Sequence, residues 1–463
     1  MPHSAAWDPD HLASGSWDAC KDGIERWCRE REMADPVVKF FILVAGHEYT
    51  DKSLAFAPMC THRAQEQIDA LNRAATEKSE GALVIPPATL RFLRFNFSTG
   101  QISVIEYSLA VNGGKTLSLD EKSWKPLSEI KDSTHYNPKS FVTDRTLRKI
   151  LESDYETIGH QYPSLKHSST QNDIMSITDV YESIQAAPDG SVVEFSIFSH
   201  GYDGGPILVN SDEADATPDD ERDPLDKDGR WDKDFGPDMG DGSGATTPRD
   251  NFVSSFDKKG MIQIWGCNAS PAPNKVIYQA FSKRRNQDDA LGKALAAHKP
   301  ISNSQLIEFE FSGDDKTEKE FREKHYADDK FFPHKPDGKP DPSIEEFTRT
   351  FLQVRQYIAR ATRDSYAYQA ALNTGIKVLG ALPGMEGDDE RTKRYNLMQV
   401  CRKQSPNPKK IDPDRLECPN GYQSRMEFYQ EPNYIGIDIS DRGYGIFTKS
   451  AVDNVKKILA IMA

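Results

Sequence analysis

Short apolar runs, rich in β-branched and aromatic residues, are separated by long polar stretches in this chain. The clearest runs are residues 37–46, 192–198 and 261–267. Each is too short for a buried helix and lacks the alternation of polar and apolar residues that a half-exposed strand shows. Strands that are buried on both faces have this pattern, and they occur in parallel sheets covered by helices. We therefore predict an α/β fold with a mostly parallel central sheet.

Further elements are expected on either side of these runs. Two strand-like runs around Ser98-Thr99-Gly100 predict a β-hairpin, and a second hairpin is expected over residues 434–447. Ser343 and Glu346 have the spacing of a capping box, which predicts a long helix that ends near Gly375. A core strand over residues 376–382 and a terminal helix complete the pattern.

Charge is distributed very unevenly along the 463 residues. The formal net charge is −14, and residues 211–242 alone contribute −9, from thirteen Asp and Glu against four Lys and Arg. This segment is rich in Gly and Pro and almost free of aliphatic residues, which predicts a solvated acidic loop.

The overall composition narrows the expected partners and compartments. A pI of about 5.4 argues against non-specific binding to nucleic acid. The mean hydropathy is −0.67 and no run is long enough to span a bilayer, so we expect no membrane span. A Sec signal pattern is not apparent, so we expect a cytoplasmic protein or one exported without such a signal.

Six cysteines are present, and none form a Cys-x-x-Cys pair. Six in a chain of this length are too few for a disulfide scaffold, which favours a reducing compartment. Zinc-ligand spacings to a histidine are lacking as well, so we predict no metal site among them.

Chemically reactive residues follow two of the predicted strands. His200-Gly201 comes just after the run 192–198, and Cys267 ends the run 261–267. The carboxyl ends of parallel strands line the ligand crevice of an α/β sheet, so neighbouring strands would bring the imidazole and the thiol together. A thiolate activated by a histidine is a nucleophile for acyl transfer. The amides of Gly201 and Cys267 are the predicted oxyanion donors.

This arrangement resembles the caspase-like cysteine peptidases, the group that includes caspases, gingipain, clostripain and CHAT-type enzymes. The resemblance rests on an apolar strand followed by His-Gly and a later apolar strand followed by Cys, in that order, over residues 37–46 and 174–285. The caspase signature Gln-Ala-Cys-x-Gly is absent, and Ile264-Trp265-Gly266-Cys267-Asn268 stands in its place.

The resemblance implies a caspase-like α/β/α sandwich with β-hairpins and long polar insertions. It implies a cysteine endopeptidase in which Cys267 attacks the peptide carbonyl, His200 is the base, and a thioacyl-enzyme intermediate forms, with no cofactor. We expect His47, Asp203 and Asn268 to bind a protein or peptide substrate. The expected parts are a polar extension (1–35), a caspase-like core (36–311) with the acidic insertion 211–242, a charged linker or insertion (312–342), and a C-terminal part (343–463) that completes the sheet.

Two functions are considered for the acidic insertion. Its field would attract cationic substrates, which suggests a basic residue before the scissile bond. Its carboxylates at residues 223–234 also suit Ca²⁺, but with Gly229 as the invariant glycine of an EF-hand loop, Pro224 and Phe235 occupy ligand positions. A solvated loop is the simpler interpretation.

Two other functions remain as alternatives. An α/β-hydrolase-like acyl hydrolase would use Cys267 as its elbow nucleophile, but it requires a small residue where Trp265 stands. It also requires a later histidine, for which the candidates are His298, His325 and His334. The other alternative is a non-catalytic relative that uses the same fold for protein interaction. The oligomeric state is left open.

Overall fold

The computed structural model describes seventeen parts of the chain. These are residues 37–46, 56–77, 88–97, 101–109, 115–123, 176–202, 204–208, 228–236, 239, 247–268, 270–285, 287–297, 299–312, 316–327, 329–385, 427–440 and 442–462. The predicted extension 1–35 lies outside them.

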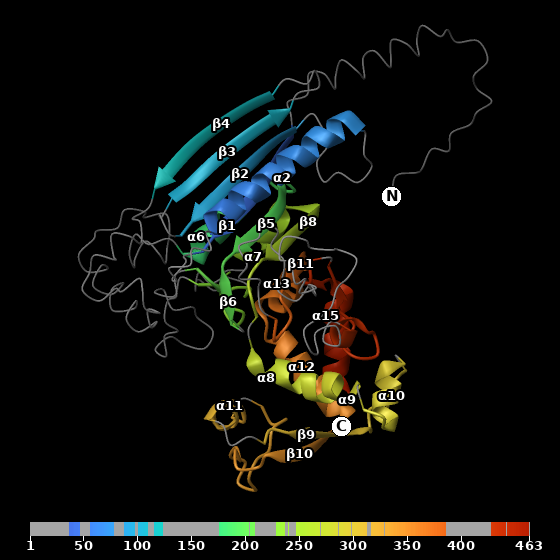
Figure 1. Cartoon of the computed structure of the whole chain (residues 1–463). Helices are drawn as coiled ribbons and strands as arrows, with labels where there is room; N and C mark the ends of the chain where they lie inside the picture. The colour runs from blue at the N-terminus through green and yellow to red at the C-terminus, as the bar shows by residue number, and fades with distance from the viewer. Residues whose placement is uncertain are drawn as a thin grey trace, which may run out of the picture.

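Within the described residues, one nine-stranded sheet has the strand order β12-β13-β11-β8-β5-β1-β2-β3-β4 (Figure 1). The central strands β2, β1, β5, β8 and β11 run parallel to one another, and antiparallel strands are added at both sides. The strands span Val37–Ala45 (β1), Ala88–Asn96 (β2), Gln101–Leu109 (β3), Lys115–Ser123 (β4), Val192–Phe198 (β5), Phe256–Ile264 (β8), Lys377–Gly380 (β11), Asp438–Ile439 (β12) and Gly445–Phe447 (β13). The predicted α/β class with parallel central strands is confirmed.

Helices cover both faces of this sheet. Glu194 and Phe195 are successive residues of β5, so their side chains point to opposite faces. Glu194 binds Arg63 of α2 (Phe56–Glu77), whereas Phe195 packs against Tyr181 of α6 (Ile177–Gln185) and Phe252 of α7 (Thr247–Ser255). Helix α2 therefore lies on one face, and α6 and α7 lie on the other. Figure 1 shows α2 lying over β1 and β2 along the direction of the strands.

A second group of helices follows β8. They are α8 (Pro271–Ile277), which continues through the π-helical turn η2 (Tyr278–Ser282) and α9 (Lys283–Arg285), then α10 (Ala290–Ala296), α12 (Phe351–Arg363), α13 (Tyr366–Thr374) and the terminal α15 (Lys449–Ala460). Helix α12 contacts both α8 and α15, and α13 contacts β11. These contacts attach the C-terminal helices to the end of the sheet that β8 and β11 form.

The predicted helix from Ser343 to Gly375 is wrong in its first part. Residues Glu346–Thr350 form strand β10, which pairs antiparallel with β9 (Leu306–Glu310). The helix begins after Thr350, whose hydroxyl accepts from the Gln353 amide at 3.2 Å while the Gln353 side chain accepts from the Thr350 amide at 2.8 Å. Strand pairing that packs the partly buried Phe347 against other aromatic rings thus overrides the local capping signal.

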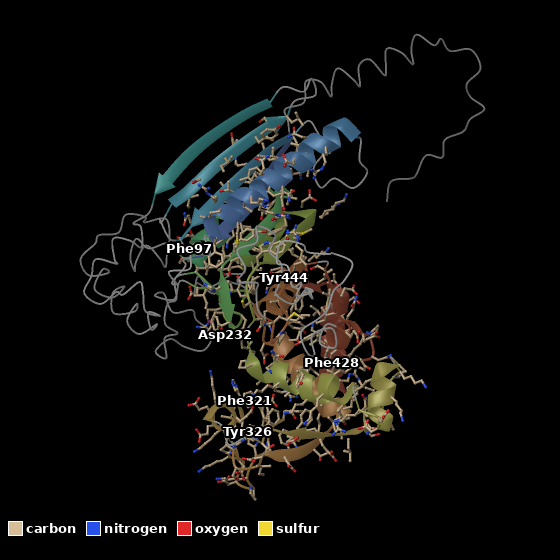
Figure 2. All side chains as sticks on the ribbon, in the orientation of Figure 1. Phe97, Asp232, Phe321, Tyr326, Phe428 and Tyr444 are labelled. Atoms are coloured by element: carbon tan, nitrogen blue, oxygen red, sulfur yellow. The ribbon has the colours of Figure 1, made fainter. Side chains whose placement is uncertain are left out.

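The described residues of the segment 312–342 are packed. They include α11 (Lys316–His325) and four buried aromatic residues. Together with neighbours from β9 and β10 these form a cluster that we call the aromatic cluster, made of Phe309, Phe311, Phe321, Tyr326, Phe331, Phe332 and Phe347. Figure 2 shows Phe321 and Tyr326 of this cluster at the end of the molecule opposite β4. The sequence did not predict this cluster, because its aromatic residues are spread among charged ones and show no helical or strand periodicity.

The described part of the acidic insertion is packed against the fold, which the prediction of a solvated loop did not foresee. Of residues 211–242 the structure describes 228–236 and 239, and several of these are buried. Asp234 is fully buried and accepts a hydrogen bond from the Tyr181 hydroxyl at 2.6 Å. Asp228, which is 4% exposed, accepts from the Leu208 amide at 2.7 Å. Hydrogen bonds to buried donors explain how carboxylates are tolerated there.

None of the helices in the described ranges is long and apolar enough to cross a membrane.

The buried ion pair between Glu194 and Arg63 gives a prediction for stability. Replacing Glu194 with Ala removes two hydrogen bonds from the buried guanidinium of Arg63, which keeps only its bond to Glu66 at 2.8 Å among the described residues. The loss should cost about 3 kcal/mol in the free energy of unfolding, the lower end of the range for a broken buried ion pair. Urea unfolding measures this. The matched control is Glu106→Ala, which removes the carboxylate of the surface pair Arg91–Glu106 and should cost about 0–1 kcal/mol. Equal losses for the two variants would contradict this account.

Candidate functional site

His200 and Cys267 follow the carboxyl ends of neighbouring parallel strands. Strand β5 ends at Phe198 and pairs with β8, which ends at Ile264. The pairing continues by one more bond, in which the Trp265 amide donates to the Ile197 carbonyl at 2.8 Å. The two segments that carry the histidine and the cysteine therefore leave the sheet side by side.

Glycines bring these two segments into contact. A Cβ atom on Gly201 would lie 2.4 Å from the carbonyl oxygen of Cys267 and 3.3 Å from its amide nitrogen. A Cβ atom on Gly266 would lie 3.0 Å from the carbonyl oxygen of Ser199. The backbones at Gly201 and Cys267 thus approach more closely than any larger residue allows. This close approach places both predicted oxyanion donors next to each other.

The local structure around His200 orients its ring. His200 is the first residue of β6 (His200–Tyr202), which forms a small antiparallel hairpin with β7 (Gly205–Ile207). Its imidazole meets the ring of Phe56 edge to face, with the ring centroids 5.3 Å apart. Phe56 is the first residue of α2, so the helix on one sheet face also supports the histidine. The ring is half-buried, which leaves part of it accessible.

The two described cysteines have very different surroundings. Cys60 is a fully buried residue of α2, and this burial raises the pKa of its thiol well above the ordinary value. Cys267 is only partly buried. The thiolate is the reactive form of cysteine, so we expect Cys60 to be inert. Of the two cysteines, Cys267 is the more accessible.

Trp265, two residues before Cys267, belongs to a polar network on the α2 side of the sheet. Its indole N–H donates to the Ser196 hydroxyl at 3.1 Å, and that hydroxyl donates to Glu194 at 2.5 Å. The guanidinium groups of Arg63 and Arg442 lie 6.0 and 5.5 Å from the ring centroid. This network holds the strand end that carries Cys267.

Asn268 is held firmly through its backbone. Its amide donates to the Met385 carbonyl at 2.7 Å, and its carbonyl accepts from the Gly384 amide at 2.8 Å. The side chain is 5% exposed, and nothing among the described residues donates to its Oδ1. A buried acceptor without a donor is costly and calls for an explanation.

A pocket of about 420 Å³ opens beside Asn268. It combines residues from the β6–β7 hairpin, the acidic insertion, the start of α8 and the α12 helix. Figure 2 shows Asp232, one of the lining residues, between the sheet and the aromatic cluster. The sequence did not predict this pocket. Trp231, which lies within the acidic run, was a signal that part of that run is packed.

The other predicted residues either lie outside the described residues or make contacts elsewhere in the structure. His47 and Asp203 lie outside the described residues. His325 packs against the ring of Phe321 at 4.9 Å, and the Nδ1 of His334 lies 2.9 Å from the Phe332 carbonyl. Both histidines therefore make contacts in the aromatic cluster. These contacts argue against either residue as the later histidine that the acyl-hydrolase alternative requires. His298 is also outside the described residues.

No group of three or more His, Cys, Asp or Glu side chains suited to a metal ion occurs in the parts of the chain that the structure describes. Of the proposed Ca²⁺ segment 223–234, residues 228–234 are described. There Asp228 and Asp234 are buried and bind protein donors. These two carboxylates are therefore used in the fold.

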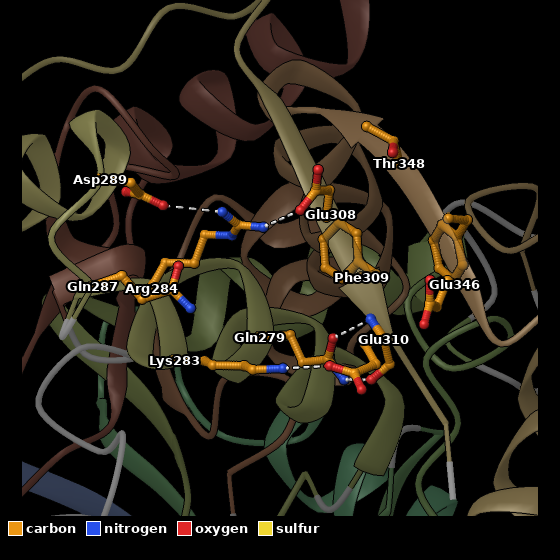
Figure 3. Close-up of a pocket in the computed structure, with 11 residues that line it drawn as sticks. Gln279, Lys283, Arg284, Gln287, Asp289, Glu308, Phe309, Glu310, Glu346 and Thr348 are labelled. Atoms are coloured by element: carbon orange, nitrogen blue, oxygen red, sulfur yellow. Dashed lines mark hydrogen bonds and ion pairs between the residues drawn. The ribbon is translucent and has the colours of Figure 1, made fainter.

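A larger pocket, of about 710 Å³, lies at the β9–β10 sheet and is lined by charged groups that already have partners (Figure 3). Arg284 lies 3.2 Å from both Asp289 and Glu308, and Lys283 lies 2.9 Å from Glu310. The Gln279 side chain accepts from the Glu310 amide at 2.8 Å. The pocket shares no lining residue with the one beside Asn268. We therefore consider it separate from the site.

Comparisons with protein-family models, curated proteins and solved structures find no match for this chain.

The contact at Gly201 gives a prediction for the site. Gly201→Ala should force the two segments apart, because the added methyl group would overlap the Cys267 carbonyl, and should cost about 1–3 kcal/mol of stability. It should also change the rate at which iodoacetamide alkylates Cys267, measured by peptide mass spectrometry.

The control for this prediction is Gly338→Ala. An added Cβ there meets no atom within 4 Å, although the positive φ of 83° strains an alanine. Gly338→Ala should lose about 1 kcal/mol and leave the Cys267 rate unchanged. If Gly201→Ala leaves the alkylation rate of Cys267 unchanged, the close backbone contact has no effect on the reactivity of this thiol.

Proposed function

We propose that this chain is a cysteine endopeptidase of the caspase-like type, with Cys267 as nucleophile and His200 as base. The observation that supports this most is the pairing of β5 with β8, which brings the segments of His200 and Cys267 into backbone contact at one sheet edge. A buried structural cysteine would have surroundings like those of Cys60. Cys267 instead lies at the carboxyl end of a parallel sheet, where ligands bind in such folds.

The proposed reaction has two steps. His200 takes the proton from the Cys267 thiol, and the sulfur attacks the peptide carbonyl carbon. The amides of Gly201 and Cys267 stabilise the negative charge on the carbonyl oxygen. The C–N bond then breaks, His200 gives its proton to the leaving amine, and a thioester to Cys267 forms. Water attacks the thioester, which releases the acid and restores the thiol.

Substrate preference is proposed from charge. The acidic insertion supplies more than half of the net charge of the chain, and its residues 230–232 line the pocket beside Asn268. A field of this sign raises the local concentration of cationic peptides. We therefore propose basic residues close to the scissile bond.

The pH dependence of thiol alkylation tests the coupling between the two residues. In the wild type the rate at Cys267 should rise with an apparent thiol pKa below about 7.5, because a neighbouring imidazolium favours the thiolate. In His200→Ala the pKa should return toward about 8.5. Iodoacetamide labelling followed by peptide mass spectrometry gives both values, and Cys60 in the same molecule is the unreactive internal standard. His62→Ala, on the exposed side of α2, is the control histidine.

A slow reaction at Cys267 that does not depend on His200 would contradict the peptidase and favour the non-catalytic interaction protein.

Turnover of a mixed-sequence peptide library tests the activity itself. Cys267→Ala should abolish cleavage, and its unfolding temperature should stay close to that of the wild type because only one half-exposed thiol is lost. Cleavage that persists in Cys267→Ala would assign the activity to another residue.

A further inference from the structure

The pocket beside Asn268 borders the segment that follows His200. Tyr202 and Gly204 line it, and both belong to the segment that His200 begins. The other walls come from the acidic insertion, from α12 and from residues shortly after Cys267, among them Asn268 and Ser270. In the proposed reaction the histidine protonates the leaving amine, so the amine half of the substrate lies on its side. The pocket is therefore adjacent to the residues that follow the scissile bond.

The size and walls of the pocket suit one long side chain. Its volume of about 420 Å³ is within the range of small-ligand sites. Three aromatic residues line it, namely Tyr202, Trp231 and Tyr357. Aromatic rings pack well against the methylene stems of Lys and Arg and attract their cationic ends.

The carboxylates that line the pocket can still accept hydrogen bonds. Three carboxylates, Asp232, Asp329 and Asp364, line the pocket together with two guanidinium groups, Arg230 and Arg360. Asp329 already accepts three hydrogen bonds, from two nitrogens of Arg360 at 2.7 and 2.8 Å and from the Phe331 amide at 2.7 Å.

Asp232 differs from Asp329. A single nitrogen of Arg230 approaches it, at 3.2 Å from one oxygen and 3.3 Å from the other. An ionised carboxylate offers about four acceptor positions, so Asp232 can accept further hydrogen bonds. Its side chain is 32% exposed, which leaves it accessible from the pocket.

Asn268 supplies the second, independent indication. Its Oδ1 accepts no hydrogen bond from the described residues, although Asn268 is buried and lines the pocket. The terminal torsion of an asparagine is broad, so rotation of the side chain can bring this oxygen to a donor bound in the pocket. The missing donor must be an N–H or O–H group. A guanidinium or an ammonium group supplies several.

From these observations we infer that the pocket binds the cationic side chain of an arginine or lysine in the residue that follows the scissile bond. Asp232 accepts from the cation, Asn268 Oδ1 accepts from a second N–H, and the aromatic walls pack against the stem. The position relative to the scissile bond rests on the proposed function. The binding of a cation in the pocket does not.

Binding is measured first without catalysis. Isothermal titration calorimetry with L-argininamide, on full-length Cys267→Ala, should give saturable binding. L-Citrullinamide, which has a neutral urea in place of the guanidinium, should bind at least about tenfold more weakly, because hydrogen bonds to a charged group are worth about 1.5–3 kcal/mol. L-Glutamamide should not bind.

Two substitutions assign the site. Asp232→Asn and Asn268→Leu, each in the Cys267→Ala background, should weaken L-argininamide binding about tenfold or more, for the same energetic reason. Asp232 is half-exposed, so the Asp232→Asn variant is expected to fold. This variant keeps the test decisive if Asn268→Leu fails to fold. The matched control is Asp189→Asn, on an exposed turn away from the pocket, which should leave the affinity unchanged.

Three outcomes overturn the inference. They are saturable binding of L-glutamamide in preference to L-argininamide, no binding of either compound, and binding that Asp232→Asn does not weaken. In the active protein, peptides with Arg or Lys directly after the scissile bond should be cleaved preferentially, and this preference should be lost in Asp232→Asn. If L-argininamide binds but no peptide is cleaved and Cys267 reacts independently of His200, the proposed function fails while the cation pocket stands.

Discussion

The parallel pairing of β5 with β8 is the interaction on which the rest of the structure depends. All seven residues of β5 are buried, and the strand lies between β1 and β8 in the middle of the sheet. Because both strands are parallel and end at nearly the same level, whatever follows them in the chain meets at one edge. His200, Gly201 and Cys267 owe their proximity to this register.

A polar network inside the sheet accompanies this pairing. Glu194 of β5 is fully buried, and two nitrogens of Arg63 donate to it at 2.8 Å each. Burial alone would lower the pKa of Arg63, but the charge and the hydrogen bonds of Glu194 outweigh this effect and raise the pKa above the ordinary value. Such a pair costs desolvation energy and is weak as a source of stability. It does, however, tie α2 to β5 in one orientation, and α2 also carries the Phe56 ring that contacts His200.

Patterns of local sequence predicted the elements that are buried by the main sheet. The runs 37–46, 192–198 and 261–267 are apolar on both faces because helices cover both faces of the sheet, and this alone indicates parallel strands. The prediction failed where residues are buried by something other than the sheet. Phe347 was assigned to a helix but lies in β10, and the Asp228–Phe235 part of the acidic insertion is packed. In both places the partners come from distant segments, so no periodicity in the chain reports them.

The sequence by itself determined the class of fold, the order of the chemically reactive residues and their positions after strands, because burial on both faces leaves a pattern in neighbouring residues. Only the tertiary structure decided which strands are neighbours, and hence that Gly201 touches Cys267. It alone brought Asp232 from the acidic insertion and Asn268 from the end of β8 into one pocket. These contacts join residues far apart in the chain, and their geometry depends on strand order and register, which single residues do not encode.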